Sequence, residues 1–374
     1  MKVEQLTLHR ATWSDTLKNI TIQPNLFILF VSPNFDKKQQ LVDQLHADYP
    51  NACITGCSTA GEISDVKVVD DTVSLTIVEL ERVTPQLYEV EISESSASRD
   101  AGIELANALQ QDDLQHVLVF SDGLNVNGAE LVNGLKSILK STSITGGLAG
   151  DGADFKETFV INNNVISDNV VVGLGFYGKS LKVGFSSKGG WDSFGIERIV
   201  TRSENNVLYE LDGLPALELY KSFLGENAKN LPSSGLLFPL SMRLNESDKP
   251  VVRTILAVDE EAQSLTFAGN IPEGSYVRLM KANVNRLIGG AEDSAIKAME
   301  AANQQAELAI LISCVGRRLV LKQLVEEEVE VVRETLGEKP KITGFYSYGE
   351  IAPFGKFSPC ELHNQTMTIT TLSE

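Results

Sequence analysis

One string of ten residues occurs twice in this chain and constrains its fold more than any other feature. Residues 54–63 read ITGCSTAGEI and residues 342–351 read ITGFYSYGEI, with Ile, Thr, Gly, Gly, Glu and Ile at the same places. A weaker third copy, ITGGLAGDGA, begins at Ile144. Self-similarity of this kind indicates that one structural unit is repeated along the chain.

Each copy is flanked by the same kinds of segment. An apolar run typical of a buried strand comes first, a helical stretch separates that run from the ITG string, and a further strand follows. The apolar runs are 26–31, 117–120 and 308–312, the helical stretches 36–48, 128–140 and 322–336, and the following strands 72–77, 170–174 and 366–371. The predicted unit is therefore strand, helix, ITG strand, glycine loop, strand.

The middle of the chain, from residue 158 to 202, consists of short strands separated by Asn, Gly and Asp turns. Such hairpins favour antiparallel pairing, so the sheets are expected to be mixed and not doubly wound. We predict an α+β fold of mixed sheets with flanking helices, built from repeated strand–helix–strand units, in two closely packed domains. Because 374 residues exceed one ordinary core, the expected domains are residues 1–195 and 196–374.

The charge of the chain limits its partners. Fifty acidic against 32 basic residues give a net charge of −18, which opposes binding to nucleic acid or to an anionic membrane. No apolar run reaches the roughly 18 residues that a membrane span needs, and the N-terminus lacks the apolar core of a secretion signal. We therefore expect a cytoplasmic protein. Its four scattered cysteines predict reduced thiols.

Several side chains of the glycine loops suit chemistry or ligand binding. Glu62 and Glu350 hold equivalent places, so a fold that brought them together would pair carboxylates for hydrolase chemistry. Alternatively, each caps the backbone N–H groups of its own loop. Cys57 is either a nucleophile with a nearby base or a small buried side chain. Tyr346 and Tyr348 suit a small polar or planar ligand, although alternating tyrosines are also ordinary sheet packing.

Two other patterns bear on cofactors. Residues 173–178 match GxGxxG, but the chain continues as a strand instead of opening a helix, which argues against dinucleotide binding. The four histidines show no metal-ligand spacing. His363 suits three roles, which are ligation of haem iron, hydrogen bonding to a ligand and satisfying a turn. His116 is the alternative haem ligand.

Six strings, in order along the chain, together resemble the FIST proteins, with both the FIST N and the FIST C halves represented. They are SDG at 121–123, ITGGLAGD at 144–151, DGLPAL at 212–217, CVGR at 314–317, YSYGEI at 346–351 and HNQT at 363–366. The resemblance implies a bacterial sensory module that binds a small ligand and acts in signal transduction. The chain is similar to stand-alone members that bind haem, sense nitric oxide and control a partner histidine kinase.

On this resemblance we expect a non-enzymatic sensor, with haem b as candidate cofactor, His363 as its axial ligand and a histidine kinase or other signalling protein as partner. Two alternatives stay open, a haem-free sensor of amino-acid-like molecules and a hydrolase that uses the paired carboxylates. Arg317 suits either an anionic group of the ligand or a structural ion pair. The expected ligand-binding residues are Ser58, Glu62, Arg317, Tyr346, Tyr348, Glu350 and Asn364.

Overall fold

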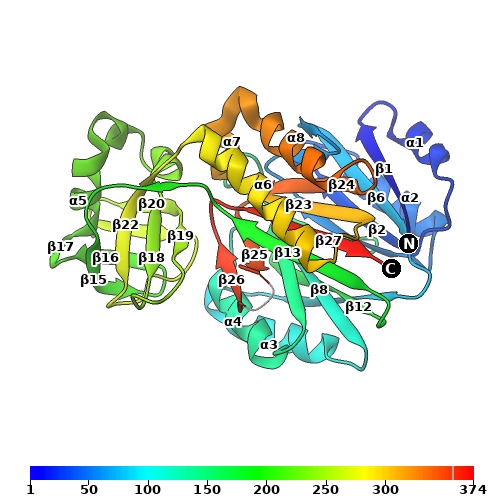
Figure 1. Cartoon of the computed structure of the whole chain (residues 1–374), viewed down its shortest axis with the longest axis horizontal. Helices are drawn as coiled ribbons and strands as arrows, with labels where there is room; N and C mark the ends of the chain where they lie inside the picture. The colour runs from blue at the N-terminus through cyan, green and yellow to red at the C-terminus, as the bar shows by residue number, and fades with distance from the viewer. Residues whose placement is uncertain (356–357) are drawn as a thin grey trace.

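A computed structural model describes residues 1–355 and 358–374 (Figure 1). It has a large body, at the right of Figure 1, and a smaller lobe at the left. The body contains three six-stranded sheets and the lobe a nine-stranded one. Because parallel and antiparallel pairs occur together with flanking helices, the chain has a two-domain α+β fold. None of the helices in the described residues is long and apolar enough to cross a bilayer.

The body is built from three repeats with one order of elements. In each repeat an edge strand leads through a helical segment to a buried strand, a second helix and the ITG strand, and then to a short hairpin and a last strand. The first repeat comprises β1 (Lys2–His9), α1 (Trp13–Thr16), η1 (Leu17–Asn19), β2 (Leu26–Val31), α2 (Lys38–Asp48), β3 (Cys53–Ser58), β4 (Glu62–Ser64), β5 (Lys67–Val69) and β6 (Thr72–Glu79). The second comprises β7 (Thr84–Glu91), η2 (Ser95–Ala97), α3 (Ser98–Leu109), β8 (Leu114–Ser121), α4 (Gly128–Ile138), β9 (Ser143–Leu148), β10 (Val160–Asn162), β11 (Val165–Ser167) and β12 (Val170–Tyr177).

The third repeat has the same order, but the lobe interrupts it. It comprises β13 (Lys182–Lys188), α6 (Val284–Ala301), β23 (Leu308–Cys314), α7 (Val315–Leu321), η5 (Lys322–Leu324), α8 (Val325–Leu336), β24 (Lys341–Ser347), β25 (Gly349–Pro353), β26 (Cys360–His363) and β27 (Met367–Ser373). The chain leaves the body after β13, near the boundary expected at residue 195, and returns to it at α6. Most of the expected second domain, residues 196–374, is thus divided between the lobe and the third repeat.

The lobe is a small sheet covered by one helix and two 3-10 segments. It comprises β14 (Asp192–Ser193), β15 (Arg198–Glu204), β16 (Val207–Leu211), β17 (Leu214–Pro215), α5 (Ala216–Leu224), η3 (Gly225–Asn230), η4 (Ser233–Leu237), β18 (Leu240–Arg243), β19 (Val251–Arg253), β20 (Ile255–Asp259), β21 (Ser264–Phe267) and β22 (Tyr276–Lys281). It has an apolar core of its own, which includes Leu208, Leu217 and Phe267.

The apolar runs predicted as buried strands are the central strands of the three sheets. Strand β2 is buried along its whole length because both of its faces are covered. Leu26, Ile28 and Phe30 enter a core shared with β8 and β23, whereas the alternate residues Phe27 and Leu29 pack with helix α2. The ring of Phe30 lies 4.7 Å from that of Phe345 and 5.7 Å from that of Phe120, so side chains of all three repeats meet in this core.

Each sheet is completed by a hairpin from another repeat. The strand orders are β1-β6-β2-β3-β10-β11, β7-β12-β8-β9-β25-β26 and β13-β27-β23-β24-β4-β5. The buried strand and the ITG strand pair in parallel in every repeat. The second repeat gives its hairpin to the first sheet, the third repeat to the second sheet, and the first repeat to the third sheet. The three repeats therefore close in a circle.

The glycine of the ITG string allows two strands to approach closely. It lies opposite a residue of the buried strand in the pairs Gly56–Leu29, Gly146–Val119 and Gly344–Leu311. A Cβ at these glycines would lie 1.8, 2.0 and 1.9 Å from the carbonyl oxygen of the opposite residue. No other residue type fits without moving the backbone, which explains why this glycine recurs in all three strings.

The loops that follow the three ITG strands meet in a ring of three main-chain hydrogen bonds. In each bond an amide of one repeat donates to a carbonyl of another, with Ala60 to Tyr346 at 2.8 Å, Gly150 to Ser58 at 3.1 Å and Tyr348 to Leu148 at 3.2 Å. Donor and acceptor hold the same two places in every string. The ring therefore joins all three repeats at their centre.

We predict that Gly344→Ala destabilises the whole body. Its new methyl group would meet the Leu311 carbonyl at 1.9 Å, and overpacking of this kind costs about 1–3 kcal/mol or more. Gly289→Ala is the matched control, because nothing lies within 4 Å of its Cβ position and alanine favours helix α6 by up to about 1 kcal/mol. Urea unfolding followed by circular dichroism measures both. A Gly344→Ala protein as stable as the wild type would contradict the close approach.

Candidate functional site

The residues expected to bind a ligand lie mostly in the interior, around the ring. At most 5% of the surface of each is exposed for Ser58, Glu62, Arg317, Tyr346, Tyr348, Glu350, Asn364 and His363. The hydroxyl of Ser58 accepts the amide of Phe159 at 3.0 Å and so fastens the exchanged hairpin of the second repeat. Cys57 is buried too, and burial raises the pKa of its thiol well above the usual value, which disfavours a nucleophilic thiolate.

Glu62 and Glu350 each bind groups of their own repeat. Glu62 accepts the amide and hydroxyl of Thr72 at 3.2 and 2.8 Å. Glu350 accepts the hydroxyl of Ser347 at 2.7 Å and the amide and hydroxyl of Thr366 at 3.1 and 2.9 Å. Burial raises the pKa of Glu62 to about 7 and that of Glu350 to about 8, and these hydrogen bonds oppose the rise. Each carboxylate therefore caps groups of its own repeat. Catalysis by the pair would instead need both carboxyl groups free in one cleft.

Tyr348 closes over a loop of the second repeat. Its hydroxyl donates to the carboxylate of Asp151, and its ring stacks on Phe155 at a centroid distance of 4.4 Å. The same carboxylate accepts the amides of Phe155, Lys156 and Glu157 at 2.7–2.8 Å. Tyr348 thus links the third repeat to the second through a hydrogen bond and a stacked ring in this conformation.

A polar cleft of about 340 Å³ opens beside this loop, and its lining is mainly acidic. The acidic residues are Glu62, Asp70, Asp71, Asp151, Asp154 and Glu157. Within the described part of the chain, no group of three or more His, Cys, Asp or Glu side chains is placed to hold a metal ion. Glu62 and Asp151 are buried and hydrogen-bonded within the protein. The other four carboxylates are exposed, which is ordinary solvated surface in a protein of charge −18.

Neither candidate histidine fits an axial haem ligand in this conformation. Nε2 of His363 lies 2.8 Å from the carbonyl oxygen of Ala352, and both ring nitrogens of His116 contact hydroxyls, of Ser143 at 2.8 Å and Thr145 at 3.0 Å. Burial lowers the pKa of His363 to about 4 and that of His116 to about 3, so both are neutral at pH 7. Iron ligation by His116 requires its ring to leave these contacts, whereas His363 keeps its contact only if iron binds through Nδ1.

Arg317 fastens the two points where the chain passes between body and lobe. It forms an ion pair at 2.8 Å with Glu328, and both side chains are fully buried. The guanidinium also donates to the carbonyl of Gly189, just after β13, and to that of Leu287 in α6 at 2.8 Å. Glu328 in turn accepts the hydroxyl of Tyr346 at 2.5 Å. Arg317 therefore occupies the structural ion pair that was one of its two expected roles.

The HNQT string forms the turn between β26 and β27 and docks the lobe on the body. The side-chain amide of Gln365 donates to the carbonyl of Leu236 at 3.0 Å and to the hydroxyl of Thr254 at 3.1 Å. Asn364 accepts the amide of Thr254 at 3.5 Å, and the indole of Trp191 donates to the carbonyl of Gln365 at 2.9 Å. This turn joins lobe and body through individual polar contacts.

A cleft of about 790 Å³ lies between the lobe and the body, and we call it the interlobe cleft. Its walls come from α4, from the segment after β18, from β19 and from the hairpin β25–β26. Its charged and amide side chains are Glu130, Asn133, Lys136, Arg243, Asp248, Lys249, Arg253, Asn270 and Glu361. The volume is in the usual range for small-molecule sites.

Arg253 is the unusual residue of this cleft, because it is buried without a carboxylate partner. It is 4% exposed and donates only to carbonyls, of Leu362 at 3.0 Å, Val252 at 3.2 Å and Asn270 at 3.3 Å. Burial lowers its pKa to about 10, against the attraction of Glu361. Among the described residues no ion pair compensates this charge, so the site favours an anion. Sequence reasoning missed Arg253 because a single arginine in a strand carries no motif.

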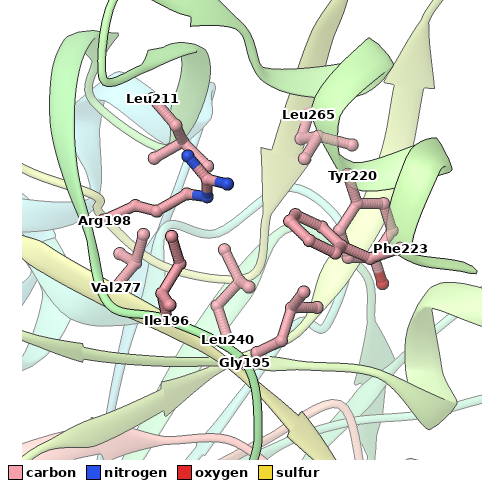
Figure 2. Close-up of a pocket in the computed structure, with 10 residues that line it drawn as sticks. Gly195, Ile196, Arg198, Leu211, Tyr220, Phe223, Leu240, Leu265 and Val277 are labelled. Carbon is pink, nitrogen blue, oxygen red and sulfur yellow. The ribbon is translucent and has the colours of Figure 1, made fainter.

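Figure 2 shows a further hollow, which is formed by the lobe alone. Its lining is almost wholly apolar and includes Tyr220, Phe223 and Leu240. Arg198 also lines it, with the guanidinium 5.4 Å from the centre of the Phe223 ring and paired to Asp212. The space of about 20 Å³ holds no more than a water molecule.

Comparisons with known proteins support the resemblance noted in the sequence. The FIST N domain model matches residues 25–214 and the FIST C domain model residues 216–353, so the two meet inside the lobe. An uncharacterized protein of Methanocaldococcus jannaschii is 26% identical, over 84% of this chain and 67% of that protein. A crystal structure of cyanuric acid hydrolase from A. caulinodans aligns with 78% of this chain and 68% of its own at 7% identity. Its TM-score of 0.24 is too low to support an argument.

Proposed function

The chain belongs to the FIST family, and on that premise we propose that it senses a small anionic molecule bound in the interlobe cleft. FIST domains are small-ligand sensory domains of signalling proteins. The observation that carries the proposal is Arg253, a buried cation that lines the cleft and has no carboxylate partner in the described residues.

The remaining charges of the cleft favour an α-amino acid as the ligand class. Arg253 suits the carboxylate, because a guanidinium binds planar oxyanions through paired N–H groups. Glu130 and Glu361 line the same cleft and suit the ammonium group. Glu130 already accepts the side-chain amide of Asn270 at 2.7 Å, and Glu361 pairs with Lys136 at 3.0 Å. These contacts hold both carboxylates in place for a zwitterionic ligand.

Ligand binding at this site would bias the placement of the lobe. Arg253 belongs to the lobe, but it donates to the Leu362 carbonyl of the body. A ligand that draws on the same guanidinium and on Glu130 of α4 contacts lobe and body at once. Since a ligand shifts only those states that it binds differently, the relative position of the two parts is the proposed signal.

We predict that Arg253→Gln abolishes amino-acid binding. The test is a thermal-shift screen of the wild type with the twenty common amino acids, followed by calorimetry with the best one. A ligand at 100 times its dissociation constant should stabilise the wild type by about 2.7 kcal/mol. Arg253→Gln should weaken binding at least tenfold, and Arg253→Lys should weaken it less because the charge remains. Arg278→Gln, which removes an exposed arginine of the same lobe, should bind normally. No stabilisation of the wild type by any amino acid would contradict the proposal.

The finer hypothesis from the family resemblance is haem-based sensing of nitric oxide with a histidine kinase as partner. It requires His363 to bind iron through Nδ1 or His116 to give up its present contacts, and the colour of the protein tests it directly. Protein expressed with haem supply should show no Soret band under the amino-acid proposal. A Soret band that disappears in His363→Ala but persists in His116→Ala would establish haem binding at His363 instead.

We propose that either sensor signals through a partner protein. A sensor histidine kinase or another signalling protein is the class that the resemblance implies. Because the chain carries a net charge of −18, its partner is expected to present a basic docking face.

A further inference from the structure

A further cleft, which shares Lys249 and Phe354 with the interlobe cleft but does not include Arg253, is lined by three lysines from three separate elements. Lys188 ends β13, Lys297 lies on α6, and Lys249 comes from the lobe segment between β18 and β19. The cleft measures about 430 Å³, and Phe185 and Phe354 form its apolar walls. Its acidic lining residue is Glu300. We call this site the trilysine cleft.

This gathering of cations is unusual in so acidic a chain. Acidic residues outnumber basic ones by 50 to 32, and many cations of the body pair with carboxylates, as Arg333 does with Asp65. No ion pair is found for the three lysines within residues 1–355 and 358–374. Lys249 instead lies over the ring of Phe354, 5.9 Å from its centre. Because carboxylates outnumber cations in this chain, most lysines are expected to have a carboxylate nearby.

The charges of the other two lysines act unfavourably on the ammonium group of Lys188. Burial lowers the pKa of Lys188, and the charges of Lys297 and Lys249 lower it further, while Asp293 opposes the shift. Lys188 is half-buried at the end of a strand and therefore has little freedom to move away. A bound anion would relieve this repulsion.

We propose that the trilysine cleft binds a phosphate or diphosphate group. Ammonium groups are compact point charges, which suit a multivalent oxyanion approached from several sides, whereas the planar carboxylate is better matched by arginine. Lys188 and Lys297 belong to the body and Lys249 to the lobe. A bound phosphate therefore contacts both parts and holds the lobe against the body, near the junction where Arg317 binds the carbonyls of Gly189 and Leu287.

Isothermal titration with sodium pyrophosphate, and separately with inorganic phosphate, tests this site at 0.15 M salt, where weak surface charge effects are largely screened. We expect saturable 1:1 binding to the wild type. Lys188→Gln and Lys297→Gln should each weaken pyrophosphate binding about tenfold, and the double variant should abolish it. Lys249→Gln should weaken it as well. Lys182→Gln is the matched control, because it removes the same charge from an exposed position of the same strand, β13, and should change affinity less than twofold.

Two results would overturn the inference. One is the absence of saturable binding of both probes to the wild type, and the other is an equal loss of affinity in Lys182→Gln and Lys188→Gln. Circular dichroism of each variant shows whether it has folded. Lys249 and Phe354 line both clefts, but Arg253 lines only the interlobe cleft and Lys188 only the trilysine cleft. Arg253→Gln should therefore retain pyrophosphate binding, and Lys188→Gln should retain amino-acid binding.

Discussion

Three main-chain hydrogen bonds between the ITG loops join the repeats, and the rest of the body depends on them. Each bond links the equivalent amide of one repeat to the equivalent carbonyl of another. The loops can cross there because each ITG strand lies unusually close to its buried neighbour, which requires glycine at Gly56, Gly146 and Gly344. The exchanged hairpins then complete each sheet with strands of another repeat. A single repeat would lack two of its six strands, so the three must fold together.

The lobe interrupts the third repeat without breaking this circle. Gly190 and Arg286 lie close together, since a Cβ on Gly190 would be 2.1 Å from the Arg286 carbonyl oxygen. Arg317 binds carbonyls on both sides of this junction, and its partner Glu328 binds Tyr346, whose carbonyl belongs to the central ring. The junction between lobe and body is therefore linked through Arg317 and Glu328 to the centre of the body.

The sequence was sufficient to predict the repeated unit, because buried strands and glycine loops leave local patterns. It did not reveal the exchange of hairpins, since segments of three residues such as 62–64 carry no signal for the sheet that they join. Side chains such as Arg317, Tyr348 and Glu350 have the chemistry of ligand contacts, but burial and internal partners decide their role here. Arg253 and Lys188 were missed for the opposite reason. Neither residue belongs to a motif in its own segment. Each lines a cleft most of whose other residues lie far away in the sequence.

Removal of the lobe tests most directly whether the three repeats form a closed body into which the lobe is inserted. Residues 191–283 would be replaced by a short Gly-Ser linker, which can span the junction at Gly190 and Arg286. The body should then show one cooperative thermal transition in its circular dichroism signal, with loss of amino-acid binding. Aggregation, or loss of the cooperative transition, would contradict the closed arrangement of the three repeats.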